Sequence, residues 1–207
     1  MKRILTFLNY PAGIKFFVLA GIVAFLSACQ NYTPKPIGYF RIEIPENEYV
    51  TFDSVAYPYV FEMSKYAKII PQKDNLTGDK YWINIFYPQF GGTIYCSYKK
   101  VQRNLQELSE DSREFVYKHT IKADEITEQP FVNSEARIYG MLYRIVGNTA
   151  SPMQFVLTDS VDYFFRGALY FNSVPNKDSI APVLDFVSED ILVLMETFKH
   201  KKLTKTK

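Results

Sequence analysis

The stretch Leu26-Ser27-Ala28-Cys29 determines which part of this chain folds, because it ends an N-terminal segment with the features of a cleavable signal. Before it lies an uncharged apolar run of 11 residues, 16–26, and the N-terminus ahead of that run carries three basic side chains, Lys2, Arg3 and Lys15. This order is typical of a secretion signal, and the run is shorter than the roughly 20 residues that cross a bilayer. A Leu, two small residues and a Cys form the pattern at which lipoprotein signals are cut. The alternative, an ordinary signal peptide that ends near a cysteine by chance, explains the match to this four-residue pattern less well.

This cleavage pattern predicts a signal peptide over residues 1–28 and a mature chain that begins with a lipidated Cys29. Acyl chains such as palmitate on its sulfur and its amine hold the protein on a membrane, because each buried CH₂ contributes about 0.8 kcal/mol. Residues 29–36 then form a polar, proline-containing tether, which reaches about 20 Å at ~3.1 Å per residue. The rest suffices for one globular domain, 37–199, followed by a basic tail, 200–207.

The charge of the chain limits its partners. The signal segment holds three of the 24 basic residues and none of the 22 acidic ones, so the mature chain has a formal charge of −1. Nucleic acid is therefore not an expected partner of this exported, slightly acidic body. Lysines crowd the last nine residues, where they form either a solvated end or a contact with anionic head groups.

Two periodicities predict the fold. Strand-forming runs occupy 39–44, 59–63, 67–70, 81–87, 93–98, 137–146, 153–158 and 163–171. Apolar residues recur at three- and four-residue spacing from Val101 to Ile126, and again from Ile180 to Phe198 after an Asp178-Ser179 start, and both patterns predict helices. Strands interrupted by one helix and closed by another predict an α+β fold, a mainly antiparallel β-sheet flanked by helices. The element order is similar to that of a Mog1/PsbP-like α/β/α sandwich.

Side chains with catalytic chemistry are few. His119 lies on the apolar stripe of the first helix, where a hydrogen-bonded core histidine is the better interpretation. With Cys29 acylated, Cys96 has no disulfide partner, and its alternating strand predicts a buried thiol. The sequence contains no metal-ligand spacing, phosphate-binding loop, dinucleotide fingerprint or nucleophile elbow. It predicts no enzyme activity, no metal and no cofactor.

Two other stretches carry unusual polar residues. The 147–151 loop holds Asn148, Thr149 and Ser151 between two apolar strands, which suits either a connecting turn or a loop that contacts a partner or ligand. Arg166 interrupts an aromatic strand and needs an acceptor, for which Asp159 on the preceding strand is a cross-strand candidate.

Taken together, these segments resemble the gliding-motility lipoprotein GldD family. The matching segments cover essentially the whole mature chain. They are Tyr32-Thr33-Pro34-Lys35-Pro36, Gly38-Tyr39-Phe40-Arg41-Ile42, Trp82-Ile83-Asn84-Ile85, Tyr117-Lys118-His119-Thr120-Ile121-Lys122-Ala123, Gly147-Asn148-Thr149-Ala150-Ser151, Leu157-Thr158-Asp159-Ser160, Phe165-Arg166-Gly167-Ala168-Leu169-Tyr170-Phe171 and Leu194-Met195-Glu196-Thr197-Phe198.

The resemblance implies a cell-envelope lipoprotein that is required for gliding and tied to the type IX secretion apparatus. It implies no catalytic residues, so a non-enzymatic assembly or scaffold component that binds other gliding or secretion proteins is the leading hypothesis. The alternative is a ligand-binding periplasmic lipoprotein with a polar pocket near His119 and the 147–151 loop. A hydrolase that uses His119 as a base lacks a recognisable nucleophile.

The resemblance also bears on modification and location. The gliding bacteria that carry this family add O-glycans at Asp-Ser/Thr followed by an apolar residue. This short pattern fits Ser54, Ser160 and Ser179. The residues after Cys29 contain neither the acidic run of surface-exported lipoproteins nor the Asp that retains lipoproteins in the inner membrane of enteric bacteria. We therefore expect outer-membrane attachment with the domain in the periplasm.

Overall fold

A computed structural model describes residue 13 and residues 42–72, 78–172 and 177–201 of the 207-residue chain. The chain divides into two compact units, Met1–Phe40 and Arg41–Lys207. Cys29, the tether and the predicted signal peptide, apart from Gly13, lie outside the described residues. The fold below is that of the second unit.

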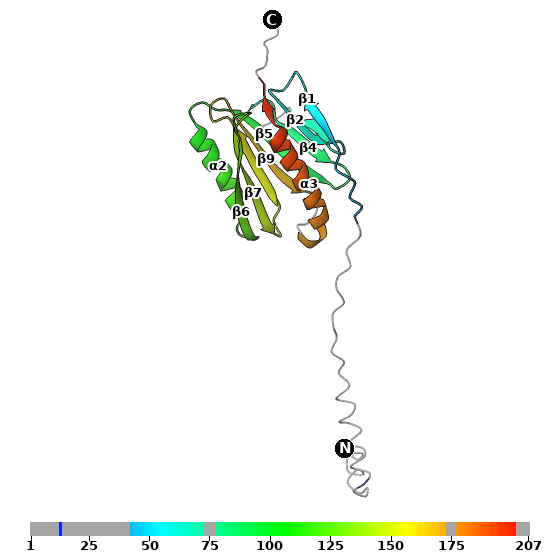
Figure 1. The fold of residues 1–207 in the computed structure, drawn as a ribbon. Coiled ribbons are helices and arrows are strands. Elements are labelled where there is room, and N and C mark those ends of the chain that lie inside the picture. The colour runs from blue at the N-terminus through cyan, green and yellow to red at the C-terminus, as the bar shows by residue number, and fades with distance from the viewer. Residues whose placement is uncertain (1–12, 14–41, 73–77, 173–176, 202–207) are drawn as a thin grey trace. The chain divides into compact units, whose positions relative to one another are not determined.

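The strands of this unit form two antiparallel sheets (Figure 1). The smaller sheet has the order β1-β2-β10, with bounds β1 Tyr49–Asp53, β2 Tyr59–Ser64 and β10 Lys199–His200. The larger sheet has the order β3-β4-β5-β9-β8-β7-β6. Its strands are β3 Lys68–Pro71, β4 Ile83–Tyr87, β5 Gly92–Lys100, β6 Ala123–Asn133, β7 Ile138–Gly147, β8 Met153–Thr158 and β9 Tyr163–Phe171.

Alternation of side chains gives the larger sheet two distinct faces. In β4, Ile83, Ile85 and Tyr87 are buried on one face, whereas Asn84 lies on the other. The turn into β5 is made at Gly91, whose φ of 60° is a left-handed conformation that glycine adopts without steric cost. The turn thus lies between the two strand-forming runs 81–87 and 93–98 that the sequence predicts.

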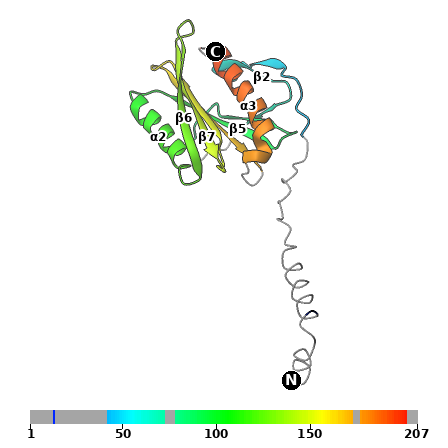
Figure 2. The same ribbon diagram turned by 60° about the horizontal axis from the view of Figure 1, so that its bottom comes forward.

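The two helices lie on opposite faces of the larger sheet (Figure 2). Helix α3, Lys177–Thr197, packs with the smaller sheet on the face that carries Ile83 and Ile85, and its Val187, Ile191 and Leu194 belong to the main core. Helix α2, Leu105–Tyr117, covers part of the other face, where Val116 packs on two residues of β7. Both helices present an apolar stripe to the sheet and a polar face to solvent.

Aromatic rings fill the centre of the main core. Tyr59 and Phe61 from β2, Phe165 from β9 and Phe198 after α3 are fully buried. The ring centres of Phe165 and Phe198 are 5.0 Å apart, and those of Tyr59 and Phe165 are 5.1 Å apart. Tilted rings at this spacing attract each other beyond the gain from burial alone, so this cluster joins the two sheets and α3.

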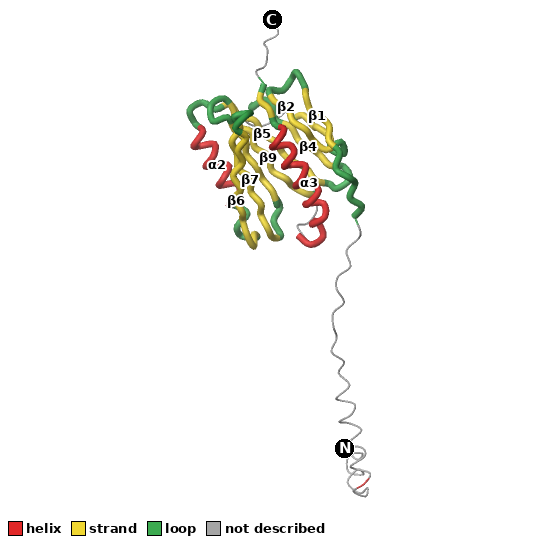
Figure 3. The backbone as a smooth tube through the Cα atoms, in the orientation of Figure 1, coloured by secondary structure: helices red, strands yellow, loops and turns green. Residues whose placement is uncertain are grey.

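The first helix ends earlier than the sequence pattern predicts. Helix α2 stops at Tyr117, and Ala123 and Ile126 belong to strand β6, which the pattern did not predict (Figure 3). The expected second helix does begin near Asp178, at Lys177. The α+β fold class, a mainly antiparallel sheet flanked by helices, is confirmed.

The packed part of the chain extends to Lys201. Strand β10 pairs with β2, and the backbone N–H of Lys201 donates to the carbonyl of Pro58 at 2.9 Å. His200 is half-buried, with its ring stacked on Tyr163 at 4.4 Å between centres. In the part of the chain that is described, no helix has the length and apolar character needed to span a bilayer.

Candidate functional site

A cavity of about 360 Å³ lies between α2 and the sheet, over strands β4, β5 and β9. Aromatic and aliphatic side chains form much of its wall: Trp82, Tyr95, Leu108, Phe115 and Phe164. Polar side chains converge on it as well: Asn84, Ser97, Lys99, Asp111 and Arg166. An apolar cavity with a few converging polar groups is the usual form of a small-molecule site.

The strand register explains why these residues meet. Ser97 of β5 lies directly opposite Arg166 of β9, so both side chains are on the α2 face of the sheet. Their neighbours along the strands, Cys96 and Phe165, point to the main core. Cys96 is buried as predicted, and burial raises the pKa of its thiol well above the ordinary range. The thiol is therefore protonated and unreactive at neutral pH.

Arg166 is the most unusual group in the cavity. Its Nη2 donates to Oε1 of Gln154 at 2.6 Å, and its guanidinium carbon lies 4.8 Å from the ring centre of Phe115. Burial lowers the pKa of the guanidinium, although arginine keeps its charge at neutral pH. A cation has thus been placed in a poorly solvated pocket.

The cross-strand partner predicted for Arg166 is wrong. Asp159 lies in the turn between β8 and β9, where its carboxylate accepts hydrogen bonds from the backbone N–H groups of Val161, Asp162 and Tyr163. Although burial opposes the change, these bonds lower the pKa of Asp159. The residue opposite Arg166 in β8 is Val156, so Gln154 reaches it diagonally.

His119 lies just beyond α2 and is half-buried. Its backbone N–H donates to the carbonyl of Val116 at 3.1 Å. Burial, and then the charge of Arg166, lower the pKa of the imidazole below its ordinary value of 6.5. The ring is therefore neutral at pH 7, but it is not part of the cavity wall described above.

The 147–151 loop packs against the turn that follows α2. Gly147 approaches this turn so closely that a Cβ atom would lie 2.5 Å from the carbonyl oxygen of Lys122. Thr149 and Ser151 are buried, and neither hydroxyl has a hydrogen-bond partner among the described residues, whereas Asn148 is exposed. The loop and His119 are thus near one end of α2, and neither lines the cavity, although the charge of Arg166 acts on the His119 imidazole.

The three candidate glycosylation residues differ in accessibility. Ser160 is exposed at the tip of the β8–β9 turn, with a φ of 68°. Ser179 is partly buried in the first turn of α3.

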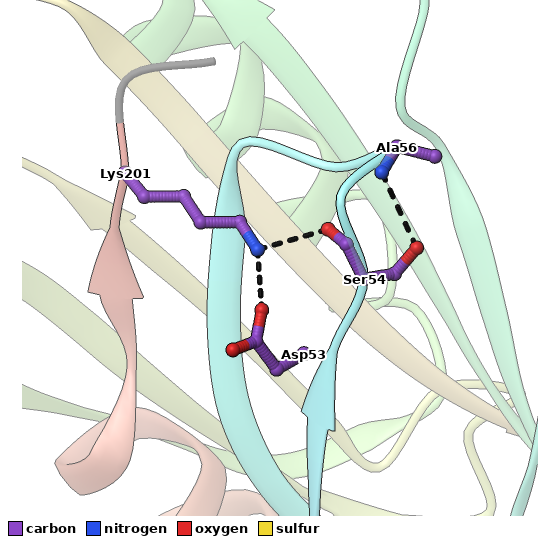
Figure 4. Close-up of polar contacts among 4 residues, drawn as sticks. All are labelled: Asp53, Ser54, Ala56 and Lys201. Carbon is purple, nitrogen blue, oxygen red and sulfur yellow. Dashed lines mark hydrogen bonds and ion pairs between the residues drawn. The ribbon is translucent and has the colours of Figure 1, made fainter. Parts of the chain in front are cut away.

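Ser54 is partly buried, and Figure 4 shows its Oγ accepting from the backbone N–H of Ala56 at 3.3 Å. The ammonium group of Lys201 binds the Asp53 carboxylate and the backbone carbonyl of Ser54, which holds this turn in place. The hydroxyl of Ser160 is therefore the easiest of the three to reach.

Sequence reasoning missed the cavity as a whole, although it singled out Arg166. Trp82, Ser97 and Phe115 come from separate parts of the chain, and the strand register together with the packing of α2 on the sheet brings them to one cavity. Among the described residues, no group of three His, Cys, Asp or Glu side chains is arranged to hold a metal ion.

No curated protein matches the chain. Among solved structures, it is similar to the solution structure of cyanobacterial PsbP (CyanoP) from Synechocystis, with 10% identity and a TM-score of 0.43 over 80% of this chain and 99% of that one. We draw nothing further from this likeness. The family model for the gliding motility lipoprotein GldD matches residues 29–200. Because this match covers most of its length, the chain belongs to the GldD family of gliding motility lipoproteins.

Proposed function

We propose that this protein is a non-enzymatic assembly component of the gliding machinery, linked to the type IX secretion apparatus and held at the outer membrane by the lipid on Cys29. The observation that carries the proposal is the family match, which starts at residue 29 and runs through the packed domain to residue 200. A tether of about 20 Å keeps the domain close to partners embedded in the same membrane.

The chemistry of the described side chains fits a binding role. The thiol of Cys96 is buried and protonated, and the imidazole of His119 is neutral beside the cation of Arg166. Exposed apolar residues offer contact surface instead. Val132 and Tyr139 lie directly opposite each other on β6 and β7, with 62% and 44% of their surfaces exposed.

Deletion of the gene is expected to abolish both spreading and protein secretion. A photo-cross-linking residue at Val132 in the full-length lipoprotein is expected to capture gliding or secretion proteins in intact, motile cells. The matched control is Val55, which is 94% exposed in the turn after β1 on the smaller sheet. Capture of no envelope protein from either position, in cells that still glide, would contradict an assembly role.

One observation favours the alternative ligand-binding role near His119. The buried hydroxyls of Thr149 and Ser151 have no hydrogen-bond partner in the part of the chain that the structure describes, which is costly unless another group supplies one. If a ligand does so, the Thr149→Val variant loses motility while the protein stays at its normal level. Normal motility in this variant favours the assembly role.

A further inference from the structure

We propose that the cavity between α2 and strands β4, β5 and β9 binds a small organic carboxylate, with Arg166 pairing to its charge and aromatic side chains enclosing its apolar body. This inference goes beyond the assembly role and does not depend on it. It also concerns a different place from the 147–151 loop and His119.

The charged side chain of Arg166 has hydrogen-bond donors that the described residues leave unused. A guanidinium has five N–H donors, and Gln154 accepts from only one nitrogen of this one. Among the described residues, no carboxylate lies within ion-pair distance of Arg166. A partly buried cation with unused donors calls for an acceptor, and a bound anion supplies it.

The geometry of Arg166 favours a carboxylate over other anions. The planar fork of a guanidinium matches the two oxygens of a carboxylate. The cavity wall also holds one further cation, Lys99, and one anion, Asp111, so its charged groups sum to a single positive charge. A monoanion balances this charge, whereas a doubly charged phosphate exceeds it.

The lining and the volume of the cavity indicate the polarity and the size of the rest of the ligand. Trp82, Phe115 and Phe164 line the cavity together with Arg166, and the ring of Phe115 lies against the guanidinium. Tyr95 lies nearer to solvent, with 44% of its surface exposed. The volume of about 360 Å³ is at the lower end of the range for small-molecule sites, which suits an acid with one ring or a short chain.

Gln154 has a positioning role in this site. It is buried in β8, its side-chain oxygen accepts from the guanidinium, and it is not itself part of the cavity wall. Asn84 and Ser97 lie on the same face of the sheet as Arg166, where their side chains can donate to a carboxylate oxygen.

The test uses Trp82, which is the only tryptophan in the chain and lines the cavity. Tryptophan fluorescence of the purified mature chain, residues 29–207, is titrated with 4-phenylbutyrate, with the uncharged 4-phenylbutyramide and with acetate. We expect the acid to bind at least tenfold more tightly than the amide or acetate. Similar Kd values for acid and amide, or no response to the acid at millimolar concentration, would overturn the proposal.

Variants test whether Arg166 is the residue that binds the carboxylate. Arg166→Gln is expected to weaken 4-phenylbutyrate binding at least tenfold and leave the amide unaffected. Arg113→Gln is the matched control, since Arg113 is exposed on α2 and pairs with Glu128 outside the cavity. Unchanged binding in folded Arg166→Gln would overturn the proposal. If that variant does not fold, the comparison of acid and amide binding in the unmodified protein tests the proposal. Failure of binding would leave the cross-linking test of the assembly role unaffected.

Discussion

At the scale of single residues, Asp190 places a carboxyl group inside the main core. It lies on α3 with only 2% of its surface exposed. The hydroxyls of Tyr87, Ser64 and Tyr49 are close to it, but none has the geometry of a full hydrogen bond to either oxygen. Burial is the main cause that raises the pKa of Asp190 from 3.8 to about 6, and the charge of Glu189 adds to it.

This raised pKa predicts that the domain becomes less stable as pH rises. Between pH 3.8 and about 6 the folded protein keeps a proton on Asp190 that the unfolded chain releases, so the free energy of unfolding falls through this range. Above it the loss levels off at about 2–3 kcal/mol. Asp190→Asn is expected to remove this loss, which chemical denaturation of the mature chain at pH 4 and pH 7.5 would measure. An unchanged difference between the two pH values would contradict the assignment.

Arg166 shows how far single residues can be interpreted from sequence. An arginine within an aromatic run needs an acceptor, and Gln154 supplies one. The predicted partner, Asp159, is wrong because the register places Val156 opposite Arg166 and Gln154 within reach. The register of this hairpin depends on the geometry of the turn between Thr158 and Tyr163, which the strand pattern alone did not specify.

At the scale of elements, strand β6 explains why the predicted helix was too long. The register of β6 shifts between Ala123 and Glu125, as in a β-bulge. The extra residue lets Ala123 and Ile126, three positions apart, both pack against the small core cluster of Val116, Tyr143 and Ile145. Three-residue spacing is also the signature of a helix, so a bulged strand directly after α2 continues the helical pattern. Strands β4, β5, β8 and β9 have no such shift, and the sequence predicted them closely.

The contact at this bulge predicts the effect of a single methyl group. Gly147 is paired with Ala123, has a φ of 130° and leaves no room for a Cβ beside the Lys122 carbonyl. Gly147→Ala is expected to destabilise the domain by about 3 kcal/mol or more, because backbone strain and a clash with backbone atoms add together. Thermal or chemical unfolding would measure it.

Gly78→Ala is the control, because Gly78 has a φ of 69° but open space around it. It carries the cost of the left-handed backbone alone, about 1–2 kcal/mol. Equal losses in the two variants would show that the close approach of Gly147 to Lys122 does not limit stability.

At the scale of the whole molecule, we expect a lipid anchor on Cys29 to govern where the domain acts. Cys29→Ala is expected to block lipidation and release the protein from the membrane fraction or leave it unprocessed, with loss of gliding. Labelling of cells with a radioactive fatty acid measures this directly. Cys96→Ala is the control, because that thiol is buried in the core and the variant should still be labelled. Wild-type labelling of Cys29→Ala would refute the anchor.

The segment after Cys29 bears on the side of the membrane that the domain faces. Residues 30–34 contain no acidic side chain, whereas an acidic run after the lipidated cysteine is the mark of surface export that the family resemblance implies. We therefore expect the domain to lie in the periplasm, where a tether of about 20 Å keeps it beside secretion components of the outer membrane. Protease added to intact cells should leave the protein whole and digest it only after the outer membrane is breached. The exposed β8–β9 turn, where Val161 is 62% exposed, offers a cleavage site once protease gains access. Digestion in intact cells would place the domain on the cell surface, and its partners would then have to be sought among surface proteins that move with the gliding machinery.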